Sequence, residues 1–90
     1  MSTLHIETEL ARSVSANMAS AVDLLQQTLL NLNNDISRLA NVWMGNSADE
    51  FQNSFLKWSH QVKQIIDELE SLKNQLEIEI AEWETAASKL

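Results

Sequence analysis

The feature that most restricts the fold of this chain is its lack of turn-forming residues. The 90 residues include one glycine, Gly45, and no proline, whereas average usage is roughly 7% and 5%. Strands need frequent turns, and only the region around Gly45 can form a sharp one. The sequence therefore predicts an all-α chain in which two long helices are joined near Gly45.

The first half of the chain carries an apolar stripe whose members follow one another at steps of three or four residues, which is typical of one face of a helix. The stripe consists of Val14, Met18, Val22, Leu25, Leu29, Leu32, Ile36, Leu39 and Trp43. Polar side chains, including Arg12, fall largely on the opposite face. Thr8, followed by Glu9, is a candidate N-cap, and Thr3 is an alternative. We predict a helix over about 8–41.

A second apolar stripe with the same spacing occupies the other half of the chain. It consists of Phe51, Phe55, Trp58, Val62, Ile65, Leu69, Leu72, Leu76, Ile80, Trp83 and Ala87. Ser47 and Glu50 form a capping-box pattern before it, and Asp49 adds negative charge to the positive end of a helix dipole. We predict a second helix over about 47–88.

The segment 42–46 between the stripes is the predicted turn. Gly45 can adopt the left-handed conformation that ends a helix. Because the turn is short, the two helices must run antiparallel, so residues 1–90 are expected to form a single helical hairpin domain.

A lone hairpin of this size has little core of its own, so we expect it to associate. Both stripes are wider than the seam between two helices, and Leu30, Leu56 and Ile78 project outside them. Two hairpins packed as a four-helix bundle would cover this surface. The partner is predicted to be a second copy of the chain or a paralogous helical hairpin. The residues expected to pack the hairpin and the dimer are Leu25, Leu29, Leu32, Ile36, Phe51, Phe55, Trp58, Leu69 and Leu72.

Several classes of function are disfavoured by composition. Without cysteine there is no disulfide or thiolate metal site, and a net charge of −7 repels nucleic acid and anionic membrane surfaces. His5 and His60 lack the spacing of a zinc site, and a hairpin offers no pocket for a small-molecule substrate. We therefore expect no enzyme activity, cofactor or metal. The N-terminal segment has no basic leader followed by an apolar run, so we expect no cleavable signal peptide.

The turn carries a recognisable motif. Trp43, Met44 and Gly45 form a W-x-G triplet midway between the two stripes, and a small residue, Ala48, and an aromatic one, Phe51, follow it. This arrangement resembles the W-x-G family of hundred-residue type VII secretion proteins, the group that includes the early secreted antigens. The resemblance covers essentially the whole chain.

The resemblance implies a small, acidic, non-enzymatic protein that dimerises and is recognised by the membrane-bound ATPase of a type VII system. Such a protein is cytoplasmic before export and is then secreted without a cleavable signal peptide. In the family, the Trp and Gly of the turn form one part of a bipartite export signal, which implies this role for Trp43 and Gly45. The other part is a Tyr followed four positions later by an acid. This chain has no tyrosine, and Ile80 with Glu84 has the same spacing.

Two alternatives remain open. The protein could be a targeting chaperone that binds the N-terminal helical domain of a larger type VII toxin and completes its export signal, which the missing tyrosine favours. It could also be a structural helical adaptor unrelated to secretion.

Overall fold

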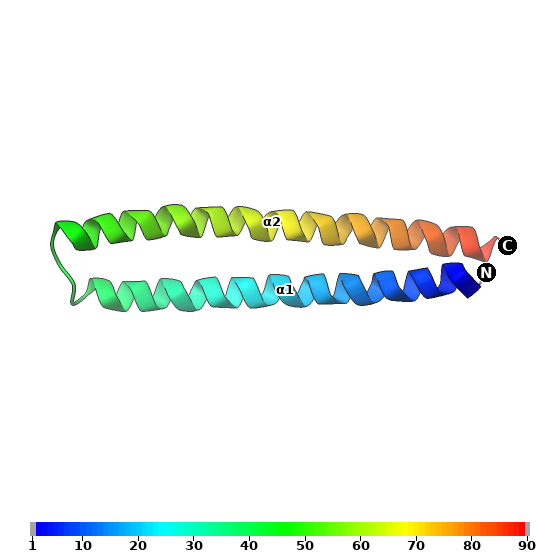
Figure 1. Cartoon of the computed structure of the whole chain (residues 1–90), viewed down its shortest axis with the longest axis horizontal. Coiled ribbons are helices and arrows are strands. Elements are labelled where there is room, and N and C mark those ends of the chain that lie inside the picture. Colours follow the sequence, from blue (N-terminus) through cyan, green and yellow to red (C-terminus); the bar gives the residue numbers. More distant parts are fainter. Residues whose placement is uncertain (1, 90) are drawn as a thin grey trace. The chain divides into compact units, whose positions relative to one another are not determined.

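The computed structural model describes the backbone of residues 2–89 and the side chains of residues 7–89. It contains two helices, α1 (Ser2–Ala40, 39 residues) and α2 (Asn46–Ser88, 43 residues), and no strand within the described range (Figure 1). The predicted all-α hairpin is therefore confirmed. Neither helix is apolar enough over a sufficient length to cross a membrane, as far as residues 2–89 show.

The first helix begins earlier than its capping signals predicted. It starts at Ser2, so Thr8 is an interior residue of α1 and its side chain is buried. The prediction of a start near Thr8 is wrong, because no glycine or proline precedes Thr8 and nothing in the sequence interrupts the helix there. The other observed ends lie one residue from the predicted ones or agree with them.

The chain divides into two compact units, each containing one segment of each helix. The termini unit comprises Met1–Val22 and Glu68–Leu90, and the turn unit comprises Asp23–Asp67. Within each unit the segment of α1 lies beside the antiparallel segment of α2 (Figure 1).

In the turn unit, the seam between the helices is formed by one side of α2. Ala48, Ser59 and Ile66 are buried there, and Val62 and Phe55 are half-buried beside them. From α1 the seam receives Leu29, which is buried, while the side chains of Leu25, Leu32 and Ile36 are half-buried. The small residues Ala48 and Ser59 allow the two backbones to approach closely.

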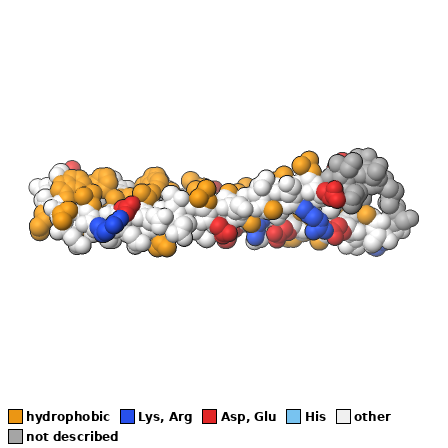
Figure 2. Space-filling view, turned by 90° about the horizontal axis from the view of Figure 1, so that it is seen from below, with side chains coloured by type: hydrophobic (Ala, Val, Ile, Leu, Met, Phe, Trp, Pro, Cys, Tyr) orange, Lys and Arg blue, Asp and Glu red, His pale blue; other side chains and the backbone are white. Residues whose placement is uncertain are grey.

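Large apolar side chains remain outside this seam. Phe51, Trp58 and Ile65 are exposed on α2 in the turn unit, at intervals of seven residues. Side chains seven apart lie on nearly the same side of a helix, so these three form one column next to the seam. Leu30 and Leu56 are exposed as well. Figure 2 shows hydrophobic side chains gathered over the end of its visible face that carries the turn.

In the termini unit the seam contains Ala11, Ser15 and Ile80, all buried, and the half-buried Leu69. Leu72, which was predicted to pack in the hairpin or the dimer, is exposed in this unit.

Candidate functional site

The W-x-G turn is closed on its α1 side by backbone hydrogen bonds. The amide of Asn41 donates to the carbonyl of Arg38 at 3.2 Å, and the amides of Val42 and Trp43 both donate to the carbonyl of Leu39, at 3.1 and 2.9 Å. These bonds satisfy carbonyls that the last turn of a helix otherwise leaves unpaired. The backbone is thus fixed as far as Trp43.

Gly45 has a φ of +109°, a conformation that residues with a side chain rarely adopt. Its carbonyl accepts the amide of Asp49 at 3.1 Å, which is the first hydrogen bond of α2. Gly45 therefore stands at the start of α2, whereas the sequence predicted that it would end α1. The reason is that α1 already ends at Ala40, and the chain needs its left-handed residue at the point where it turns into α2.

The turn is also closed by an aromatic contact. The Trp43 and Phe51 rings have centroids 5.4 Å apart and are tilted by 46°. Trp43 is half-buried by this contact, although it lies in the turn. Ala48, one helical turn before Phe51, is only 1% exposed, so its side chain is fully covered by the hairpin. A second ring contact joins Phe55 and Trp58, with centroids 5.6 Å apart.

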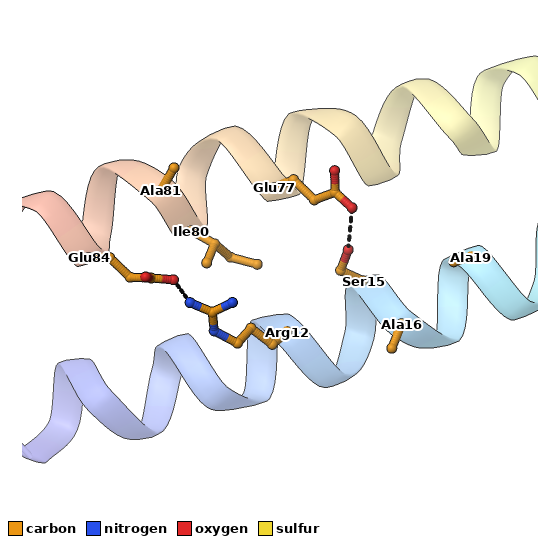
Figure 3. A pocket seen from close by; sticks show the side chains of 8 residues that line it. All are labelled: Arg12, Ser15, Ala16, Ala19, Glu77, Ile80, Ala81 and Glu84. Atoms are coloured by element: carbon orange, nitrogen blue, oxygen red, sulfur yellow. Dashed lines mark hydrogen bonds and ion pairs between the residues drawn. The ribbon is translucent and has the colours of Figure 1, made fainter.

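The second pair of predicted site residues, Ile80 and Glu84, lies in the termini unit. The Ile80 side chain is 5% exposed and belongs to the seam. Glu84 is partly exposed and forms an ion pair with Arg12 of α1 (Figure 3). Arg12 was expected on the face opposite the apolar stripe, but its long side chain reaches across to α2 from the edge of the seam.

The same side of the termini unit holds an open groove of about 530 Å³. Within it, Ser15 donates a hydrogen bond to Glu77 at 3.3 Å (Figure 3). The Nζ atom of Lys73, one helical turn earlier on α2, lies 3.8 Å from the same carboxylate. The groove is otherwise lined by Ala16, Ala19, Ile80, Ala81 and the Arg12–Glu84 pair. Its charged groups are already paired within the chain, and it has no arrangement of groups that would perform acid–base chemistry.

Among the described side chains, no three histidines, aspartates or glutamates lie close enough together to hold a metal ion. His60 is exposed on α2. The other histidine of the sequence analysis, His5, lies outside the side chains that the structure describes.

Comparison with known proteins decides the family. The family model described as "WXG100: Proteins of 100 residues with WXG" matches residues 3–86. The chain belongs to the WXG100 family. It is thus a small helical protein of the type VII secretion-associated class. No curated protein and no solved structure matches this WXG100 chain.

Two features of the turn were not predicted from the sequence. The first is the exposure of Val42 and Met44, which are the two most exposed large hydrophobic residues among those described. Their exposure could not be found from helical periodicity, because both lie outside α1 and α2. The second is the contact between Trp43 and Phe51, the aromatic residue after the motif.

Proposed function

We propose that this WXG100 protein is exported by a type VII secretion system as a dimeric helical bundle, and that its W-x-G turn is part of the signal read by the system's membrane-bound ATPase. The observation that carries the proposal is the fixed geometry of the turn. Trp43 is held by Phe51 and by the Leu39 carbonyl, and Gly45 supplies the positive φ. A structurally defined turn is what a recognition signal requires, because it presents the same surface in every copy.

The dimer is proposed to form through the column of Phe51, Trp58 and Ile65. These apolar side chains are exposed in the single chain, and exposed contiguous apolar surface marks an interaction site. Ser54 and Gln61, which lie beside the column on α2, are uncharged. A second copy or a paralogous hairpin could therefore pack against Phe51 and Trp58 without meeting a charge at these two positions, and Glu68, which follows Ile65 at the same spacing, marks the end of the uncharged stretch.

Light scattering of purified variants tests the dimer. Ile65→Glu should shift the protein from dimer to monomer, because it places a charge in the proposed interface. Leu56→Glu is the matched control, since Leu56 is exposed on α2 but lies outside the column. If the Ile65→Glu variant remains a dimer, as the Leu56→Glu variant should, the column is not the interface.

Secretion from cells that carry the matching type VII system tests export. The Trp43→Ala protein should remain folded by circular dichroism, because the seam of each unit is intact, but it should stay in the cytoplasm. Normal secretion of a folded Trp43→Ala variant would refute the export role of the turn.

A targeting chaperone is the second candidate, and one observation favours it. The position that corresponds to the family's tyrosine is Ile80, which is 5% exposed, and Glu84 is engaged by Arg12. The chain thus offers little free surface for the second half of a bipartite signal. A larger toxin could supply that half from its own N-terminal helical domain.

Secretion measured for both proteins separates the two candidates. If the chain is a chaperone, Trp43→Ala should block secretion of the partner toxin. If the chain carries its own complete signal, both Trp43→Ala and Glu84→Ala should block secretion of the chain itself.

A further inference from the structure

In the W-x-G turn, the Trp43 ring packs against Phe51, while its two neighbours in the chain, Val42 and Met44, are exposed. Val42 is 79% exposed and Met44 is 84% exposed, whereas the Trp43 ring between them packs against Phe51. The surface that a partner meets at this turn is therefore made by Val42 and Met44 more than by Trp43.

No charged residue lies within the turn itself, and the nearest acids along the chain are Asp49 and Glu50 at the start of α2. The sequence from Leu39 to Ala48 has no ionisable side chain. The nearest basic residue on the α1 side, Arg38, is paired with Asp35 one helical turn earlier. Two exposed apolar side chains in a turn that carries no charge of its own complement an apolar pocket better than a charged surface.

The size of this surface also restricts its partner. A stable dimer interface involves about 20 to 30 residues and about 800 Å² on each side. Two side chains at a turn cannot supply that area, so Val42 and Met44 are unsuited to hold a second hairpin on their own. They suit insertion into a preformed pocket, where a few central side chains dominate the binding. Methionine is enriched at such positions because its flexible thioether adapts to the pocket.

We infer that Val42 and Met44 are the contact residues of the turn, that they insert into an apolar pocket on the type VII export ATPase, and that Trp43 is a positioning residue. This inference rests on the export function proposed above. Trp43 acts by holding the turn against Phe51, which fixes the directions of its two neighbours.

The first experiment compares secretion of the double variant Val42→Ser/Met44→Ser with that of Leu24→Ser. Leu24 is exposed on α1 in the same unit and is the matched control for loss of surface apolar area. The double variant should keep the parent's helicity and dimerisation, while secretion of the chain and of any co-exported toxin falls at least tenfold. Leu24→Ser should be secreted normally.

The second experiment separates positioning from contact. Trp43→Phe keeps an aromatic ring that can pack on Phe51 and should restore secretion that Trp43→Ala abolishes. If Trp43→Ala blocks secretion but the double variant is secreted at the parental level, the inference is wrong and the export function stands.

Three other results would also overturn the inference. A folded Trp43→Phe variant that is retained as fully as Trp43→Ala would show that the indole itself is contacted. Loss of dimerisation in the double variant would assign Val42 and Met44 to the dimer interface. Normal secretion of Trp43→Ala would remove the proposed export function and this inference with it.

Discussion

The Trp43 ring packs on the Phe51 ring, with centroids 5.4 Å apart, and so joins the last residues before the reversal to the first turns of α2. Aromatic pairs in this range contribute about 0.5 to 1.5 kcal/mol beyond their burial. A double-mutant cycle with Trp43→Ala and Phe51→Ala should therefore yield a coupling of that size in the free energy of unfolding. The same cycle with Leu24→Ala in place of Phe51→Ala should yield none. If the changes in the free energy of unfolding caused by Trp43→Ala and Phe51→Ala simply add in the double variant, the two rings are not in contact.

Gly45→Ala should lower the free energy of unfolding by about 1 kcal/mol or more, because an alanine is strained at a φ of +109°. No atom lies within 4 Å of the position that the added Cβ would occupy, so the loss would come from backbone strain alone. Gly45→Val should cost more, since a branched side chain is less tolerant of this conformation. Asn41→Ala, in the same turn but without a positive φ, is the control. Denaturant unfolding at one fixed protein concentration measures all three.

Leu29 and Leu30 are adjacent in α1 but differ in surroundings: Leu29 is 5% exposed and Leu30 is 53% exposed. Leu29→Ala should destabilise the protein by about 2 to 5 kcal/mol, because it removes buried apolar atoms and leaves a cavity. Leu30→Ala should change stability by about 0.5 kcal/mol or less. Equal effects in urea unfolding would mean that α1 is rotated about its axis relative to the described structure.

The Arg12–Glu84 ion pair should contribute little to stability. Both side chains are about half exposed, so water and salt screen their attraction. A double-mutant cycle with Arg12→Ala and Glu84→Ala should give a coupling of about 0 to 1 kcal/mol that shrinks further in 1 M salt. A coupling well above 1 kcal/mol that resists salt would indicate that association buries the pair.

Much of the fold could be predicted from the sequence because the deciding signals are local. One glycine, no proline and two stripes at helical spacing leave room for two helices and one reversal. The start of α1 was less predictable, since a threonine that could cap a helix is also accepted inside one. The W-x-G triplet with Ala48 and Phe51 likewise identified the family that the comparison then established.

The sequence by itself determined that α2 has an apolar side, but only the tertiary structure decided which edge of that side faces α1. Two overlapping sets of α2 residues, both spaced by steps of three and four, could face α1. Both sets contain Phe55, Val62 and Leu69. The more hydrophobic set adds Phe51, Trp58 and Ile65, while the structure instead buries Ala48, Ser59 and Ile66. Periodicity cannot separate the two sets, because adjacent positions are rotated by about 100° around the helix axis, and an apolar stripe is itself about that wide. The packing of the two helices decides the matter: the small side chains of Ala48 and Ser59 take up little space in the seam, and the neighbouring large rings of Phe51 and Trp58 remain outside it.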